Sequence, residues 1–517
     1  MASLFSGLNN ARSGLMASQT ALDIASQNIS NASTPGYSRQ TLSLTSAGPD
    51  IGAYRFTQTQ TLVGYGVNYK DVSQSRDSFL DVRYRDAVSG NSDWQGQSDA
   101  QKQIEDIFNE FSSSSSGTLT GLSGQMTSLS KTLLQYQNNP NDSTMPTTIK
   151  SAVDTILFTV RNDYKNLADF AAQEKGDLSV TVDGDKTGGG INSILGNIAD
   201  LNKQIVGYEI VGQKANDLRD QRNTLLDTLS GYVDIDATEQ SNGMVAVGLK
   251  NDSQHMLVST DNTVTKLQLN STKDGVYWAD GNPDGNTDGT PPTAKLATIN
   301  GGTVDAYLQV INGDGSGTGE YGGMGVAYFT NKLNTFAKGF DNMLNTFAAE
   351  YQTITPPTTV DTASSALVHI GDLDPANPAA DIAISTGWQI DADLFKKNYT
   401  GSSIGNYAGE LINTIKQNGT VKLTDDIPYS GSILDFSDSF TSDIATALNH
   451  TQGMADSTSS IVSNIDAQRK SISSVSIDEE AINIIRFQQS YNASARVITA
   501  IDEMMDKLIN STGIVGR

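Results

Sequence analysis

The sequence predicts a mainly α-helical protein with an inserted β domain, in which helices from the two ends of the chain pair as a coiled coil. Three observations predict this fold class: heptad spacing near both termini, helical periodicity over most of the interior, and period-two alternation after residue 233. At 517 residues the chain exceeds what one hydrophobic core usually serves, so about three domains are expected.

The first thirty residues carry a seam that steps alternately by three and four residues. Its members are mostly small or medium-sized: Leu8, Ala11, Leu15, Ser18, Leu22, Ala25 and Ile29. The last forty residues repeat this step with bulkier side chains: Ile484, Phe487, Tyr491, Ser494, Ile498, Ile501, Met505 and Leu508. The two segments are therefore predicted to be coiled-coil partners, with Gly513 as the stop signal of the second.

One helix pair of this size is marginal on its own. Burial of the apolar residues of the C-terminal seam contributes roughly 10 to 20 kcal/mol in all, while ordering the backbone costs about 1 to 2 kcal/mol per residue. We therefore expect both ends to fray in the monomer and to become ordered when several copies pack together.

The interior alternates between helical patterns and a strand-rich insert. Helical periodicity marks residues 92–175, 191–233, 323–352 and 440–470, and short strands are predicted at "GMVAVGL", "HMLVST", "TKLQLN", "GVYWAD" and "TVDAYLQVI". The order is nested, with both termini at one end. The predicted domains are 1–70 with 465–517 (terminal coiled coil), 71–233 with 325–464 (helical, with a mixed segment at 352–435) and 234–324 (inserted β domain).

Composition excludes several functional classes. Acidic residues outnumber basic ones 58 to 34, and the net charge of −24 argues against unassisted binding to nucleic acid or anionic lipid. The absence of cysteine excludes disulfides, thiolate metal sites and a cysteine nucleophile. No run of about 18 apolar residues and no signal-peptide pattern occurs, so neither membrane insertion nor a cleaved signal is expected.

Two patterns imitate catalytic or nucleotide sites. Gly401–Gly405 matches the nucleophile elbow around Ser403, with His450 downstream and Asp425 and Asp443 between them, but the preceding "LFKKNYT" is polar and unlike a buried strand. Gly317–Gly322 matches a dinucleotide fingerprint with Asp341 about twenty residues further on, but no apolar parallel strand follows. We interpret both as glycine-rich loops next to helices.

Metal sites are poorly supported by the residue pattern. Asp284–Gly289 and Asp183–Gly188 imitate half of a calcium loop, but position 12 is Lys295 in one and Ile194 in the other, which leaves only weak surface calcium binding open. The histidines are scattered, at His255, His369 and His450. On a heptad helix, Arg486 and Arg496 are interpreted as flanking charges. No catalytic residue, metal site or cofactor is therefore predicted.

Three segments carry a family resemblance: "LFSGLNNARSGLMASQTALDIASQNISNASTPGYSRQ", "ANDLRDQRNTLLDTLS" and "SSVSIDEEAINIIRFQQSYNASARVITAIDEMMDKLI". The chain resembles the axial proteins of the bacterial flagellum, and most of all the family of first hook–filament junction proteins. The motif residues of this family are matched by Pro35, Gly36, Tyr37, Arg39, Asp478, Glu479 and Glu480. Ser474 departs from the pattern, because the family usually has glycine there.

The resemblance implies a structural subunit that adds at the hook tip and self-associates into a short tubular junction between hook and filament. It implies an inner core formed by the terminal coiled coil and an outer position for the β domain. The implied partners are further copies of the chain, the hook protein, the second junction protein and an export chaperone that covers the C-terminal helix. The implied location is extracellular, after export through the flagellar type III apparatus.

Two alternatives remain at this stage. A hook- or rod-type axial subunit, or another filament-side subunit, shares the heptad termini but lacks the Ala215–Ser230 motif or the "GYSR" ending. A secreted serine hydrolase built on Ser403 is a different class, and it would require hydrolytic activity that is lost in Ser403→Ala.

Overall fold

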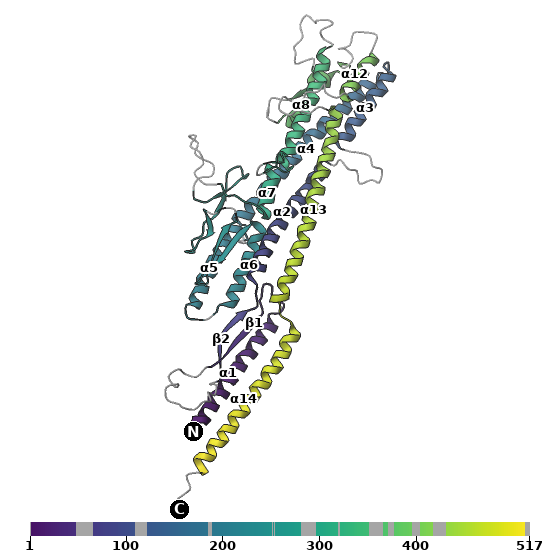
Figure 1. Cartoon of the computed structure of the whole chain (residues 1–517). Coiled ribbons are helices and arrows are strands. Elements are labelled where there is room, and N and C mark those ends of the chain that lie inside the picture. Colours follow the sequence, from purple (N-terminus) through teal and green to yellow (C-terminus); the bar gives the residue numbers. More distant parts are fainter. Residues whose placement is uncertain are drawn as a thin grey trace, which may run out of the picture. The chain divides into compact units, whose positions relative to one another are not determined.

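The structure is a computed structural model that describes residues 2–47, 66–108, 121–184, 189–212, 214–250, 252, 254–280, 296–318, 321–350, 366–370, 377–394, 404–416 and 431–511. Over these residues the chain is mainly helical with a few small sheets (Figure 1), which confirms the predicted fold class at this level. The chain divides into two compact units: unit 1 contains residues 1–89, 188–266 and 459–517, and unit 2 contains residues 90–187 and 267–458.

Unit 1 combines the terminal helices with an internal helical hairpin and two small sheets. Its elements are α1 (Ala2–Ser30), β1 (Gln40–Ser46), β2 (Val67–Gln74), the first part of α2 (Ser78–Phe108), α5 (Ile191–Glu209), α6 (Asn216–Tyr232), β3 (Ile235–Glu239), β4 (Val245–Leu249), β5 (Met256–Val258), the last part of α13 (Ile433–Ser473) and α14 (Ile477–Ser511).

Both sheets of unit 1 are antiparallel. The first contains β1 and β2, paired from Gln40 opposite Gln74 to Ser46 opposite Val67, with a register shift between Ser43 and Leu44. The second has the order β3-β4-β5, and every residue of its central strand β4 is buried. Residues Gln40–Ser46, which follow the end of α1 in the chain, are therefore extended.

Unit 2 is built largely from long helices. Its elements are the remainder of α2, α3 (Leu122–Asn138), α4 (Met145–Asp183), β6 (Leu267–Leu269), β7 (Val276–Trp278), α7 (Gly302–Asn312), α8 (Val326–Glu350), β8 (Val368–Ile370), α9 (Pro378–Asp381), β9 (Ile382–Ile384), α10 (Thr386–Ile390), α12 (Ile404–Lys416) and the first part of α13. Two antiparallel strand pairs, β6 with β7 and β8 with β9, lie beside these helices.

The large hydrophobic core of unit 2 is aromatic near α8. The apolar face of this helix is buried at Phe329, Leu333, Phe336, Phe340 and Leu344, and the side chain of Phe347 lies outside the described residues. Apolar residues recur every three or four positions along α8, so one face of the helix enters the core. That core also receives side chains from α2, α3, α4, α12 and α13.

One predicted strand is wrong. "TVDAYLQVI" was expected to be extended, but residues Gly302–Asn312 form the helix α7. Val304, Leu308 and Ile311 are buried at spacings of four and three, which is the helical period. Asp305 accepts a hydrogen bond from the N–H of Gly301 at 2.6 Å and so satisfies a donor at the start of the helix. The abundance of β-branched and aromatic residues masked this period.

The other four predicted strands are present as β4, β5, β6 and β7, and the structure adds β3, which was not predicted. Strands β3, β4 and β5 belong to unit 1, and β6 and β7 belong to unit 2. The division of the chain into three nested domains stays a prediction.

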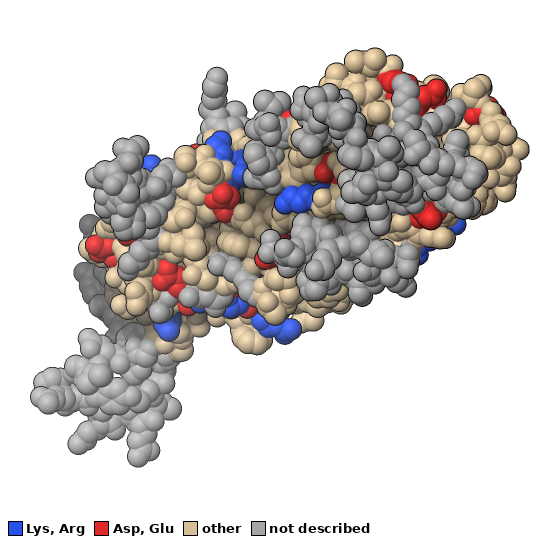
Figure 2. Space-filling view, turned by 90° about the horizontal axis from the view of Figure 1, so that it is seen from above, with Lys and Arg blue, Asp and Glu red and all other residues tan. Residues whose placement is uncertain are grey.

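The acidic excess of the chain is not gathered on the face drawn in Figure 2, where acidic and basic side chains are interspersed among uncharged ones. Among the described residues, no helix has the length and apolar character needed to cross a lipid bilayer.

Candidate assembly site

The terminal helices α1 and α14 lie side by side in unit 1 (Figure 1). Two glycines of α1 face α14: a Cβ on Gly7 would lie 3.4 Å from Ile501 Cδ1, and a Cβ on Gly14 would lie 3.2 Å from Ser494 Oγ. As the residue number rises along α1 it falls along α14, so the helices are antiparallel. The start of α1 and the end of α14 therefore lie at the same end of the pair.

The predicted seam residues differ in burial. In α1, Ala11, Ser18 and Ala25 are buried, and the half-buried members are Leu8, Leu15, Leu22 and Ile29. In α14, Ile501 is buried, and the half-buried members are Ile484, Phe487, Tyr491, Ser494, Ile498 and Met505. Leu508 is 44% exposed. The contribution of these residues to packing between copies stays a prediction.

Sequence reasoning missed part of the contact face of α1. Ala17, Ala21, Ile24 and Asn28 are buried although they are not seam positions. The sequence feature that indicates this contact face is a second series of mostly small residues at seven-residue spacing: Gly7, Gly14, Ala21 and Asn28. Small residues permit close approach of two helices, and the two glycines of this series are the ones that face α14.

The chain turns sharply after α1 because of Gly36. Its φ of 79° lies in the left-handed region, where glycine is favoured. A Cβ at this position would also lie 2.2 Å from Thr224 Oγ1 of α6, which is closer than any side chain could tolerate. Pro35 is exposed at the same turn. The motif residue Gly36 is therefore required both by the backbone conformation and by the approach of α6.

Asn28 fixes the path of the chain on the far side of this turn. Its side-chain Nδ2 donates to the carbonyl of Gln40 at 2.9 Å, and its Oδ1 accepts from the N–H of Gln40 at 3.0 Å and from Tyr37 Oη at 2.8 Å. Burial, with the negative charges of Asp217 and Asp220, raises the pKa of Tyr37 to about 12. Tyr37 therefore remains a neutral hydrogen-bond donor at physiological pH.

Arg39 joins the two motif-bearing ends of the chain. Its Nε donates to Glu480 Oε1 at 2.7 Å and its Nη1 lies 3.2 Å from Glu479 Oε2. Its backbone N–H donates to the carbonyl of Ser473 at 2.9 Å, at the end of α13. Of the predicted motif residues, the structure thus brings Arg39, Glu479 and Glu480 together, while Asp478 lies exposed in the first turn of α14.

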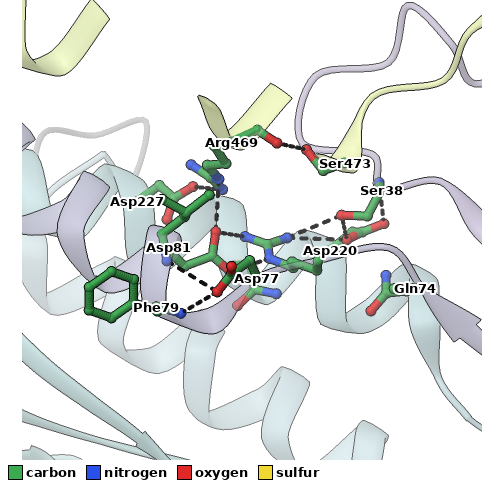
Figure 3. Close-up of polar contacts among 12 residues, drawn as sticks. Ser38, Gln74, Asp77, Phe79, Asp81, Asp220, Asp227, Arg469 and Ser473 are labelled. Atoms are coloured by element: carbon green, nitrogen blue, oxygen red, sulfur yellow. Dashed lines mark hydrogen bonds and ion pairs between the residues drawn. The ribbon is translucent and has the colours of Figure 1, made fainter. Parts of the chain in front are cut away.

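A network of charged side chains surrounds Ser38 (Figure 3). Ser38 donates to Asp220 through its N–H at 3.0 Å and through its Oγ at 2.9 Å. Arg76 pairs with Asp81 at 2.5 Å and with Asp220 at 3.4 Å. Arg469 of α13 pairs with the same Asp81 at 2.8 Å. The start of α2, the middle of α6 and the end of α13 are therefore joined to the turn after α1.

The carboxylates of this network are held by ion pairs and hydrogen bonds to neighbouring side chains. Asp227 accepts from Arg85 at 2.8 Å and from Arg469 at 2.5 Å. Burial raises the pKa of Asp220, and the hydrogen bonds from Ser38 and the charge of Arg76 oppose that rise. Since each of these acids is bound to an arginine, the arrangement suits fixing the angles between helices.

The functional residues that sequence reasoning left out come from the Ala215–Ser230 motif. Asn216, Asp217, Asp220 and Asp227 all contact residues after the turn or the arginines around it. The motif was recognised as a sequence marker, and its position in the sequence gave no sign that it lies against residues 38–40.

The residues weighed for other chemistry do not form a site among those described. Ser403, Asp425 and the loop Asp284–Gly289 lie outside the described residues. Asp443 accepts from Tyr328 Oη at 2.6 Å and pairs with Lys332, and the exposed His450 stacks edge-on to Trp94 with ring centroids 5.4 Å apart. Within the described ranges, no three His, Asp or Glu side chains are grouped as metal ligands would be.

The other two histidines and the two arginines of α14 make local contacts or are exposed. His255 bonds Asp252 at 2.9 Å, and the guanidinium of Arg486 lies 5.2 Å from the ring centroid of Phe487 on its own helix. His369 and Arg496 are exposed.

Comparison with known families finds matches along most of the chain. The family described as "Flagellar hook-associated protein FlgK helical domain" matches residues 101–354. The families described as "Flagella basal body rod protein" and "Flagellar basal body rod FlgEFG protein C-terminal" match residues 8–37 and 471–511. The matches at the two ends coincide with α1 and α14.

Individual relatives match from end to end. "Flagellar hook-associated protein 1" of Bacillus subtilis (strain 168) is 28% identical over 100% of both chains. The protein of that name in Escherichia coli (strain K12) is 26% identical, over 97% of this chain and 99% of the relative. A solved structure, "The structure of the flagellar hook junction protein FlgK from Burkholderia pseudomallei", matches 56% of this chain and 47% of its own chain at 16% identity, with a TM-score of 0.39.

Proposed function

The chain belongs to the family of flagellar hook-associated protein 1, and from that premise we propose that it forms the junction zone between hook and filament by self-association of its terminal helices. It is a structural subunit of the bacterial flagellum. The observation that carries the proposal is the bond between Arg39 and Glu480, which joins the N-terminal and C-terminal family motifs in one cluster.

The support for self-association is the surface that α14 leaves uncovered. Ile482, Ile485, Val497 and Met504 of α14 are exposed by 66%, 56%, 48% and 46%. A helix with one apolar side against α1 and another in solvent is suited to pack against further copies. We place α1 and α14 in the inner core of a tubular assembly, with the rest of the chain nested outward and the β insert outermost.

The proposed partners follow from this position. Besides further copies of the chain, they are the hook protein below, the second junction protein above, and an export chaperone that covers α14 before assembly. We propose an extracellular location in the flagellum, reached through the type III apparatus without a cleaved signal. A C-terminally truncated chain that still bound such a chaperone normally would rule out the chaperone contact.

A rod- or hook-type subunit is the second candidate, because both terminal segments match rod-protein families. The helical-domain match over residues 101–354 favours the junction role. We propose no enzymatic activity and no cofactor. The hydrolase alternative has no supporting observation, since Ser403 lies outside the described residues.

The experiment is electron microscopy of cells lacking this gene, with an assay for flagellin in the culture medium. The proposal predicts complete hooks without filaments and flagellin monomers in the medium. Missing hooks would assign the protein to the rod or hook class, and normal filaments would refute the flagellar junction role.

A further inference from the structure

We propose that a groove in unit 1 receives strand β1 of a second copy of this chain, which adds to the free edge of β3. The inference rests on the proposed function, because it assigns a specific contact to self-association. The groove has a volume of about 770 Å³. Residues 71–74 of β2 and 236–239 of β3 line it, together with side chains of α2 and α6.

The edge of β3 is open toward this groove. Among the strands that the structure describes, the order β3-β4-β5 leaves β3 with a neighbour on one side only. Gln240 donates to the carbonyl of Met244 at 2.8 Å, and Lys250 donates to that of Asp234 at 3.2 Å, so the even-numbered residues of β3 face β4. The backbone groups of Ala237 and Glu239 therefore point away from β4. They have no hydrogen-bond partner among the residues that the structure describes.

The other strand that lines the groove is β2, and its outer edge is already covered by α6. Asn216 Nδ2 donates to the carbonyl of Val72 at 3.0 Å, and Gln74 Nε2 donates to the carbonyl of Asn216 at 3.1 Å. An incoming strand would therefore find its main-chain partners on β3, where strand addition uses the exposed N–H and C=O groups.

The charges around the groove favour an uncharged strand. Four basic and four acidic side chains line it: Arg76, Arg85, Lys214 and Arg219, with Asp71, Asp81, Asp236 and Glu239. The chain as a whole has a net charge of −24, so its copies otherwise repel one another. The neighbouring groove beside Pro35 is lined by Asp200, Asp217 and Asp220 without a described lysine or arginine. The balanced groove is thus the better place for a second copy.

Strand β1 has the matching properties. Its sequence "QTLSLTS" contains no charged residue. Ser75 donates to the carbonyl of Arg39 at 2.8 Å and Ala47 to that of Gly66 at 2.9 Å, so the backbone groups of the odd-numbered residues face β2 and those of Leu42, Leu44 and Ser46 point away from β2.

The apolar side chains on the two surfaces are complementary. Leu44 is 48% exposed, and its cross-strand partner Tyr69 is 58% exposed. Val82, which lines the groove, is 46% exposed and can receive an apolar side chain. Contact between β1 of one copy and β3 of the next is heterologous and leaves the same surfaces open at each end, so it can repeat along a tubular assembly.

The first test replaces a single backbone donor. Ala237→Pro removes an N–H that points away from β4 at a sheet edge, where proline is tolerated. The hairpin of β3 and β4 is therefore expected to fold. Association of copies should weaken about tenfold. Ala237→Val keeps the N–H and is the matched control, expected to assemble as the parent chain does. Equal assembly of Ala237→Pro and Ala237→Val would overturn the proposal.

The second test uses the absence of cysteine in the chain. One copy carries Thr45→Cys and another carries Thr238→Cys, and both are assembled together and treated with a short bifunctional maleimide. A cross-linked pair of the two variants is expected. Thr228→Cys, an exposed position on α6 outside the groove, replaces Thr238→Cys in the control and should give little product.

The outcomes separate this contact from the wider function. Cross-linking of Thr238→Cys to a different flagellar protein would refute the second copy as the occupant. Absence of the cross-link in a chain that still completes the junction would refute the strand contact and leave the junction role intact. If the parent chain itself never reached the hook tip, the proposed function would be refuted.

Discussion

Arg39 joins the two ends of the chain through both its side chain and its backbone N–H. The Arg39 side chain is 24% exposed and that of its partner Glu480 is 4% exposed, so the pair is largely withdrawn from water. Removal of one partner leaves a buried charge unpaired, which costs more than the loss of an exposed ion pair.

We expect Arg39→Gln to lower the free energy of unfolding by about 1 to 3 kcal/mol, because the buried carboxylate of Glu480 loses its charged donor. Urea denaturation of the monomer measures this change. Lys470→Gln is the matched control, since Lys470 pairs with Asp466 at 2.6 Å while 70% exposed, and it should cost almost nothing. Equal effects of the two substitutions would contradict the role assigned to Arg39.

Asp93 predicts a pH dependence in unit 2. Burial and the negative charge of Asp305 raise its pKa to about 7, against the hydrogen bond from Gln97. Because the folded state holds the proton more tightly than the unfolded state, the stabilisation is complete below the unfolded pKa near 4 and is lost as the pH rises through about 7.

Asp93→Asn should therefore raise the free energy of unfolding at pH 8 by about 2 to 4 kcal/mol and change it little at pH 4. Thermal unfolding at the two pH values measures the effect. Asp99→Asn, whose parent side chain is 57% exposed, serves as the control and should show no such difference between pH values. A gain from Asp93→Asn that is the same at both pH values would refute the titration.

At the residue scale, the sequence identified individual motif positions but not their partners. Arg39 and Glu480 were both named through the family resemblance, and their bond spans 441 positions of sequence, which no local pattern encodes. Asn28 and Asp220 were missed because an asparagine on a helix and an aspartate in a polar motif usually lie in solvent. Only the folded turn at Gly36 brings them to Ser38 and Gln40.

At the scale of elements, periodicity identified the long helices and failed where a short one is rich in β-branched residues. α8 and α14 were predicted because their apolar residues recur over several turns. α7 has only 11 residues, so its helical period was read as the alternation of a strand. The end of each helix depends on contacts such as that of Gly36 with Thr224, which the sequence does not display.

The packing of α1 on α14 predicts a sharp dependence on side-chain size. Gly14→Leu should separate the two helices, because a Cβ at this position already lies 3.2 Å from Ser494 Oγ. In the assembled protein, hydrogen exchange of the α1 amides should become faster by about tenfold or more, which corresponds to about 1.4 kcal/mol of lost protection.

Gly453→Leu is the control for this experiment, since a Cβ on that helical glycine would meet nothing within 4 Å. It should leave exchange in α1 unchanged and, by relieving a helical glycine, should not destabilise α13. Unchanged exchange of α1 in Gly14→Leu would show that the two helices do not depend on this close approach.

At the scale of the whole molecule, the terminal helices combine a modest intramolecular interface with an uncovered apolar side on α14. We expect the amides of α1 and α14 to exchange rapidly in a dilute monomer and to become protected on assembly, because neighbouring copies supply the missing contacts. Amides in the core of unit 2 should be protected in both states. Slow exchange at both ends of the monomer would contradict this expectation.

Composition and motif order predicted the class of the whole molecule better than its internal division. The heptad termini and the absence of a catalytic constellation pointed to an assembly subunit, and full-length relatives agree. Domain limits are harder to predict, because contacts group β3, β4 and β5 with the terminal helices and β6 and β7 with the other unit. Such grouping depends on pairings between distant segments, which a single sequence does not reveal.

The most direct test of the junction role is to locate the protein on intact flagella. Gold-labelled antibodies against unit 2 should mark a single narrow zone at the boundary between hook and filament. Labelling along the filament, along the hook or at the rod would contradict the role assigned to this chain.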